Sequence, residues 1–202
     1  MKKGFTLIVL TIILTGAPVF AQGEFLKEGE RGLGVAPQFL FGDNHTVSGV
    51  SAGYCLENSL ELSFAYAHNS DPEADAFCPA LTFYKKETRD RSMLGLALTV
   101  GLEMVSAGGN DNTAILVFGA GGFDNFYLNE SIVLQPSIHG SFSFKLEGTE
   151  DRTLGILTGG LAMAFNHTKT VRPFVSTSIG ITAEADSEIF FGLGFGIIVA
   201  LQ

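Results

Sequence analysis

The feature that most constrains this chain is the regular alternation of large apolar and small residues in its last segment. Over residues 189–201, one set of alternate positions is continuously apolar, while the interleaved set is mostly small. The apolar set is Ile189, Phe191, Leu193, Phe195, Ile197, Val199 and Leu201. Because successive side chains of a β-strand point to opposite faces, this period of two predicts a strand with one apolar face and one face of small residues.

The same alternation recurs along most of the chain. It predicts ten strands, most of them 9–14 residues long, at 32–42, 46–56, 60–67, 76–86, 93–104, 114–122, 131–144, 153–166, 172–182 and 189–201. The two faces are least distinct over 114–122, where glycine and alanine blur them, and over 153–166, where the phase shifts near Gly155. An arrangement of eight strands stays open if two weak segments merge or pack outside.

The composition of the second face separates two all-β architectures. A soluble β-sandwich carries polar residues on its outer face, whereas the face opposite the apolar one here carries Gly, Ala and Ser with few charges. Strands of sandwiches are typically about 5–6 residues long, and a tilted strand that crosses a membrane needs about 9–11. Since no strand edge can stay unpaired in lipid, the sequence predicts a closed antiparallel up-and-down transmembrane β-barrel.

The first 21 residues have the layout of a secretory signal peptide: a positive start at residues 1–3, an apolar run over 4–16 and a small-residue cleavage pattern over 19–21. An uncleaved anchor is the alternative, but the run is short for a spanning helix, which needs about 20 apolar residues. We therefore expect a signal peptide at 1–21, a periplasmic N-terminal segment at 22–31 and the barrel at 32–202. Export and a barrel together predict location in the cell outer membrane.

The connections between strands predict the topology. Outer loops are expected at 43–45, 69–75, 106–113, 145–152 and 183–187, and periplasmic turns at 57–59, 87–91, 123–129 and 167–171. An even number of strands places both ends of the barrel in the periplasm, as in bacterial single-chain barrels. Cys55 then lies near the periplasmic end and Cys78 near the outer end, much farther apart than the roughly 7 Å between Cα atoms that a disulfide allows. Two unbridged thiols are expected.

Charge excludes one class of partner. The net charge of −9 argues against nucleic acid, whose binders carry basic patches. Outer-membrane lipid is the partner expected for the apolar face. Eleven acidic residues fall in or beside the expected outer loops, which suits divalent cations because hard cations prefer oxygen ligands. They are Asp43, Asp71, Glu73, Asp75, Asp111, Glu147, Glu150, Asp151, Glu184, Asp186 and Glu188.

Three stretches carry a resemblance to a known group. Residues 54–62 (YCLENSLEL) and 126–134 (FYLNESIVL) both run from an aromatic residue through a polar turn into an alternating strand, and residues 172–175 (RPFV) begin the final hairpin. In these stretches the chain resembles the small outer-membrane β-barrel proteins of Gram-negative bacteria, the OmpX-like and OmpW-like group in the broad sense. The resemblance implies insertion by the barrel-assembly machinery as a partner. It implies no functional residue, because fold does not fix function.

If the apolar face meets lipid, the small face lines the bore. The larger polar candidates for the bore lining are Gln38, Glu61, Glu103, Gln135, His139 and Arg172. One interpretation is a narrow passive channel for small solutes, in which carboxylates favour cations. The other is a closed structural barrel, in which the glycines relieve crowding and larger residues fill the bore. A surface-interaction protein that uses its acidic outer loops to bind cations, lipid or a partner is the alternative function.

Signals of catalysis are missing from the sequence. No H-E-x-x-H, G-x-S-x-G or C-x-x-C motif occurs, and the four histidines fall in separate segments. A nucleophile, a base and a group that orients the base are needed together for acyl transfer. We therefore expect no enzymatic activity, no cofactor and no dedicated metal site.

Overall fold

The computed structural model describes residues 22–27, 29–42, 46–57, 59–70, 73–107, 111–146, 153–183 and 187–201. A short 3₁₀ helix, η1 (Gln22–Phe25), precedes ten β-strands. The strands are β1 (Arg31–Phe41), β2 (Thr46–Leu56), β3 (Leu60–Ser70), β4 (Glu73–Thr88), β5 (Ser92–Ala107), β6 (Asp111–Tyr127), β7 (Ile132–Lys145), β8 (Thr153–Phe165), β9 (Val171–Thr182) and β10 (Ile189–Leu201). Among the described residues, no helix is long and apolar enough to cross a membrane.

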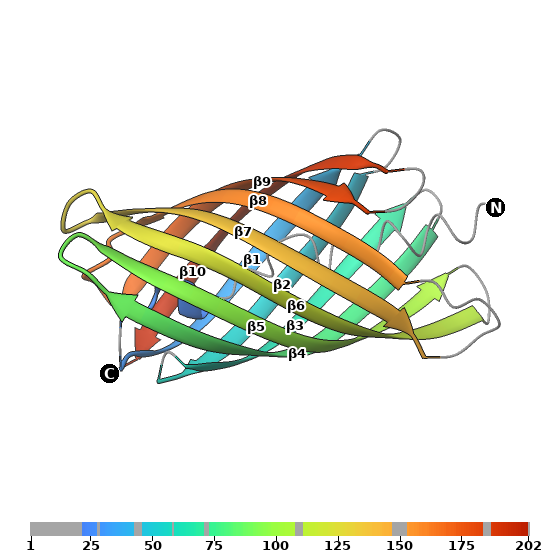
Figure 1. Ribbon diagram of the computed structural model, residues 1–202, viewed down its shortest axis with the longest axis horizontal. Coiled ribbons are helices and arrows are strands. Elements are labelled where there is room, and N and C mark those ends of the chain that lie inside the picture. The colour runs from blue at the N-terminus through green and yellow to red at the C-terminus, as the bar shows by residue number, and fades with distance from the viewer. Residues whose placement is uncertain are drawn as a thin grey trace.

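The ten strands close into one antiparallel barrel (Figure 1). Each strand pairs with the strands before and after it in the sequence, and β1 pairs with β10 to complete the ring. The strands are between 11 and 17 residues long, which is enough to cross a bilayer at a tilt. The predicted closed up-and-down barrel is confirmed, with ten strands rather than eight.

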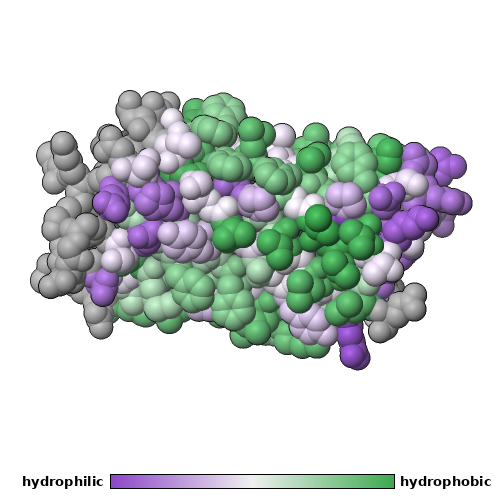
Figure 2. All heavy atoms as spheres, turned by 180° about the vertical axis from the view of Figure 1, so that it is seen from behind, coloured by the Kyte–Doolittle hydropathy of each residue, from purple (hydrophilic) through white to green (hydrophobic). Residues whose placement is uncertain are grey.

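The alternation in the sequence separates the bore from the outer surface. In β10, Phe191 and Leu193 are 56% and 52% exposed, whereas Phe190 between Ile189 and Phe191 is 4% exposed. Figure 2 shows apolar side chains over much of the middle of the molecule and hydrophilic ones gathered toward its ends. Burying this apolar face in hydrocarbon is favourable, and the backbone polar groups satisfy one another within the barrel.

Several boundaries differ from the predicted ones. β6 extends over Asp111–Tyr127 rather than 114–122, so the turn expected at 123–129 begins only after Tyr127. Much of the loop expected at 69–75 belongs to β3 and β4 instead. The cause is that ladder hydrogen bonds continue through glycine-rich and polar positions, where the apolar alternation is lost but strand pairing is not.

The outward apolar belt predicts a depth-dependent response to charge. Leu98, near the middle of β5, is 61% exposed, and Leu128, in the turn after β6, is 59% exposed. Leu98→Arg should lower the free energy of unfolding by about 2–4 kcal/mol, and Leu128→Arg by about 0–1 kcal/mol, because only the first places a charge at the bilayer midplane. Urea unfolding in lipid vesicles measures both. Equal losses would contradict the assignment of the belt.

Candidate functional site

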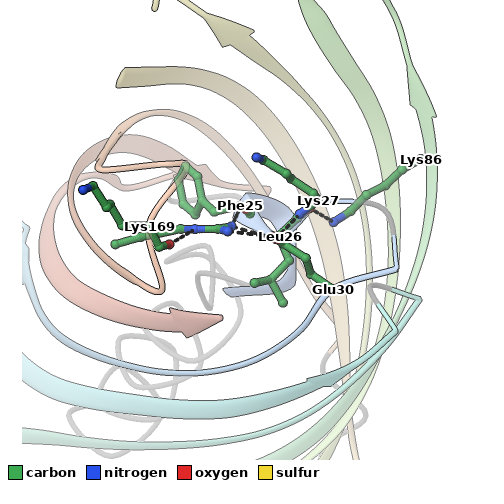
Figure 3. A network of polar contacts seen from close by, with 7 residues as sticks. Phe25, Leu26, Lys27, Glu30, Lys86 and Lys169 are labelled. Atoms are coloured by element: carbon green, nitrogen blue, oxygen red, sulfur yellow. Dashed lines mark hydrogen bonds and ion pairs between the residues drawn. The ribbon is translucent and has the colours of Figure 1, made fainter. Parts of the chain in front are cut away.

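Residues 24–26, in the segment that precedes β1, lie inside the barrel. The sequence analysis placed residues 22–31 in the periplasm, but Glu24, Phe25 and Leu26 are each at most 1% exposed. We call residues 24–26 the plug. Figure 3 shows the short helix of this segment within the ring of strands. The physical reason is that a bore lined by small residues leaves room, and an apolar pair that fills this room leaves water.

Two apolar contacts seat the plug. The ring of Phe25 stacks on that of Phe174 in β9, with 5.6 Å between ring centroids. Leu26 lies over Gly32 in β1, where an added Cβ would be 2.8 Å from both methyl groups of Leu26. The absence of a side chain at Gly32 therefore makes the space that Leu26 occupies.

Side chains from three strands bind the backbone of the plug. Asn125 Nδ2 from β6 donates to the backbone carbonyl of Glu24 at 2.6 Å. Arg172 Nη1 from β9 donates to the carbonyl of Phe25 at 3.1 Å. Lys86 Nζ from β4 donates to the carbonyl of Leu26 at 3.3 Å. A buried polar group without a partner costs roughly 1–3 kcal/mol, so these three donors make burial of the plug backbone possible.

Arg172 ties the plug to the residues that follow it. Its guanidinium forms two hydrogen bonds with the carboxylate of Glu30, at 2.7 and 2.8 Å, and its Nε donates to the carbonyl of Lys169 at 2.9 Å. The backbone N–H of Lys27 donates to the same carboxylate at 2.7 Å. Burial raises the pKa of Glu30, but the hydrogen bonds from Arg172 and Lys27 outweigh burial and leave this pKa below its ordinary value. Glu30 is therefore a carboxylate at neutral pH.

The six bore candidates from the sequence all point inward. Gln38, Glu61, Glu103, Gln135 and Arg172 are buried, and the side chain of His139 is 17% exposed. Four of them form part of the surroundings of the plug: Glu61, Gln135, His139 and Arg172. Gln38 instead donates to Ser51 at 3.0 Å. Glu61 lies at the periplasmic start of β3 and Glu103 near the outer end of β5, so the two carboxylates occupy different levels of the bore.

Glu24 is the functional candidate that sequence reasoning missed. Its Oε1 has no hydrogen-bond partner among the described residues and lies 3.9 Å from Nε2 of His139. Burial raises the pKa of Glu24 to about 8, the ammonium of Lys86 lowers it in part, and the carboxylate of Glu61 raises it further. Glu24 is therefore mostly neutral at pH 7. The apolar pair Phe25–Leu26 directly after Glu24 was the available signal, because such a pair is out of place in a solvated linker.

Large inward rings lie against glycines of the neighbouring strand. At four cross-strand pairs, a Cβ added to the glycine would overlap the ring opposite it. The pairs are Gly95 with Phe123, Gly121 with His139, Gly180 with Phe190, and Gly196 with Phe174. The glycines thus provide room for rings that reach into the bore.

Buried apolar side chains form a cluster in each half of the bore. The periplasmic half holds a cluster around the plug that includes Phe25, Leu26, Phe123 and Phe174. The outer half holds a second cluster that includes Leu40, Val105, Val117 and Phe190. Cys55 belongs to the first cluster and Cys78 to the second, and within the described chain neither is in a disulfide. Beside the plug, a recess of about 400 Å³ at the periplasmic mouth reaches as far as Glu30 and Arg172.

The described histidines lie in three separate places. His139 is in the bore, and His167 is in the turn before β9, where burial lowers the pKa of its imidazole to about 4. His68 is on the outer surface, with Nδ1 3.0 Å from Oδ1 of Asp75, which also accepts a hydrogen bond from the hydroxyl of Tyr66 at 2.6 Å. The described part of the chain contains no group of three or more His, Cys, Asp or Glu that could hold a metal ion.

Most of the acidic outer-loop residues that suggested a cation site lie outside the described residues. These are Asp43, Asp71, Glu147, Glu150, Asp151, Glu184 and Asp186. Glu73, Asp75, Asp111 and Glu188 are described and lie at or beside strand ends. The expected signal peptide at 1–21 and His45 also fall outside the described residues.

The buried ion pair between Arg172 and Glu30 should stabilise the fold far more than the exposed ion pair between Arg31 and Glu57 at the same rim. Arg172 is 2% exposed at its side chain, whereas the side chains of Arg31 and its partner Glu57 are 51% and 67% exposed. Arg172→Met should lower the free energy of unfolding by roughly 3–5 kcal/mol, since it removes the cation that pairs with a partly buried carboxylate and the donor to the carbonyl of Phe25. Arg31→Met should cost about 0–1 kcal/mol. Urea unfolding of both variants tests this, and similar losses would contradict it.

Crowding between rings and glycines predicts a second contrast. Gly95→Ala should lower the free energy of unfolding by about 1–3 kcal/mol, because the new methyl group overlaps the ring of Phe123. Gly159 in β8 has no atom within 4 Å of an added Cβ, so Gly159→Ala should be within about 0.5 kcal/mol of the parent. The same unfolding assay applies, and a tolerated Gly95→Ala would show that the ring has room to move.

No protein-family model matches the chain, and no curated protein matches it. Among solved structures, the β domain of the Bordetella autotransporter BrkA is 13% identical, with 86% of this chain and 99% of that chain covered at a TM-score of 0.48. The outer-membrane protease OmpT from Escherichia coli is 9% identical, with coverages of 89% and 100% and a TM-score of 0.48. The NanC porin is 8% identical, with coverages of 84% and 100% and a TM-score of 0.47.

Similarity at this level does not transfer an activity, and these proteins include a protease as well as porins. The closed barrel and its outward apolar belt themselves identify the class, since a sheet without open edges is what lipid requires of β-structure. The chain is a ten-stranded antiparallel β-barrel with an outward apolar belt, which is the architecture of a transmembrane barrel.

Proposed function

We propose that this protein is a non-enzymatic outer-membrane barrel whose bore is closed by its own N-terminal segment. The observation that carries the proposal is the burial of residues 24–26 in the periplasmic half of the bore. A chain segment in that position occupies the path that a solute would take. The alternative of a narrow passive channel is disfavoured for the same reason.

Hydrogen bonds to the backbone of the plug support closure of the bore. Asn125, Arg172 and Lys86 each donate a hydrogen bond to one plug carbonyl. Hydrogen bonds to charged groups contribute about 1.5–3 kcal/mol, and neutral ones about 0.5–1.5 kcal/mol. Together with the burial of Phe25 and Leu26, these contacts favour the docked position over a solvated one.

The rest of the bore supports the same conclusion. The second apolar cluster, with Leu40, Val117 and Phe190, lies in the outer half. Between the clusters, polar side chains bond to each other, as Gln38 does to Ser51 and Thr82 to Thr99. Side chains that bond to one another in this way give a packed interior rather than a lining that faces a water column.

The outer surface supports lipid as the partner of the barrel. Exposed apolar residues such as Leu98, Phe142 and Phe191 form the belt that hydrocarbon would cover. Catalysis has less support: among the described histidines only His68 has a carboxylate bonded to its ring, and that pair is on the open outer surface. Binding of divalent cations by the outer loops stays a separate proposal, which calcium-dependent stability of a triple Asp71, Glu73 and Asp75 neutralisation would test.

The closed bore predicts electrical silence. In acidic buffer, where Glu24 is neutral, the protein purified from outer membranes should insert into planar bilayers, with its fold verified by a heat-dependent gel shift, and give no discrete current steps. A variant with Phe25→Ser and Leu26→Ser should fold but lose the seat of the plug, and Lys27→Ala, which alters the partly exposed residue beside it, is the matched control. Discrete, salt-dependent steps from the unaltered protein would overturn the proposal.

A further inference from the structure

Ionisable groups from three strands surround the one plug side chain that can change its charge. Glu24 lies 3.9 Å from His139 of β7, and it interacts electrostatically with Lys86 and Tyr84 of β4 and with Glu61 of β3. Tyr84 donates a hydrogen bond to Glu61 at 3.2 Å. On the other side of the plug, Arg172 of β9 is already paired with Glu30.

The remaining strands present few ionisable groups to the plug. β1 offers Gly32 and Ala36, β10 offers Ile198 and Ala200, and β2 offers the thiol of Cys55. β5 and β8 contribute Met93, Ala97, Ala162 and Ala164, and β6 contributes Phe123 and Asn125. No further cation among these described residues is available to balance a second carboxylate beside Glu61.

The charge balance around Glu24 therefore depends on its proton. With Glu24 neutral, the ammonium of Lys86 and the carboxylate of Glu61 compensate each other. With Glu24 ionised, a second carboxylate is added where its Oε1 is fully buried and has no donor among the described residues. A buried charge without compensation is expensive, and the plug can relieve the cost by leaving the bore and hydrating its carboxylate.

We propose that the plug is a pH-sensitive stopper: it docks most tightly in acid, and ionisation of Glu24 releases it from the periplasmic half of the bore. This inference rests on the proposed function, because it assigns a regulation to the same plug. The proposal is based on the buried cluster that Glu24 forms with His139, Lys86 and Glu61.

Proton linkage gives the direction in which docking of the plug depends on pH. Burial raises the pKa of docked Glu24 to about 8, from 4.5 for the ordinary carboxyl. Because the docked state has the higher pKa, the stabilisation by docking is fully present below pH 4.5, and it is lost as pH rises towards the docked pKa. Between these two pKa values the docking equilibrium should fall by as much as about tenfold per pH unit, and it should level off above about pH 8.

The native cysteines provide the measurement. Cys55 is 1% exposed in the cluster around the plug, and its strand partner is Gly32, on which Leu26 sits. Cys78 is in the outer cluster, away from the plug. In protein purified from outer membranes and carrying Cys78→Ala, the rate at which a small cationic thiosulfonate modifies Cys55 would be measured between pH 5.5 and 9. The Cys55→Ala protein reports on Cys78 as the internal control.

Glu24→Gln is the matched variant, since it keeps the shape of the side chain but cannot ionise. The quantity to compare is a ratio of two modification rates of Cys55 at the same pH: the rate with Glu24 divided by the rate with Glu24→Gln, both in the Cys78→Ala background. This ratio cancels the intrinsic reactivity of the thiol. We expect this ratio to rise by up to about tenfold per pH unit below pH 8 and then to level off, while Cys78 stays protected. His139→Gln should retain the rise.

A constant ratio would overturn the proposal, and so would a rise that His139→Gln abolishes, since the titrating group would then be the imidazole. The thiol assay does not depend on conductance. A barrel that conducts but shows the expected ratio would therefore refute the proposed closure alone, and a silent barrel with a constant ratio would refute only the stopper.

Discussion

The structure depends on one requirement of its solvent: in hydrocarbon, every backbone N–H and C=O must find its partner within the protein. A β-sheet meets this requirement only by closing on itself, as β1 does by pairing with β10. Closure decides the rest. It turns one face of every strand to lipid, and it creates a bore that must hold either water or side chains.

Side chains enter that bore in two ways. Inward rings such as Phe123 and Phe190 lie against glycines of the next strand, so the many glycines of the small face make room for rings and do not by themselves leave the bore empty. The second way is the N-terminal plug, which brings an apolar pair into the remaining space. The backbone of the plug carries carbonyls into the bore, and these explain why Asn125, Lys86 and Arg172 point inward.

The charged groups in the periplasmic half of the bore lie around the plug, and they differ in whether they are paired. Arg172 and Glu30 form a double hydrogen bond next to the recess, and the hydrogen bonds from Arg172 and Lys27 hold the pKa of Glu30 below its ordinary value despite its burial. Oε1 of Glu24 is buried with no such partner among the described residues, and burial raises the pKa of this carboxyl. In the stopper that we propose, a group held neutral in this way couples docking of the plug to proton concentration, because its charged form is disfavoured where it is buried.

The sequence by itself determined which face of each strand meets lipid, because period-two alternation is local and a shift of one residue would exchange the faces. It predicted ten strands but left eight open, and closure of β1 on β10 in the tertiary structure decided for ten. It also identified inward residues such as Glu61, His139 and Arg172. It did not identify their companion Glu24 or the exact end of β6, since neither follows from alternation. Only the tertiary structure decided that residues 24–26 enter the bore: that position depends on donors from β4, β6 and β9, and contacts between residues as distant as Glu24 and Asn125 have no signature in local pattern.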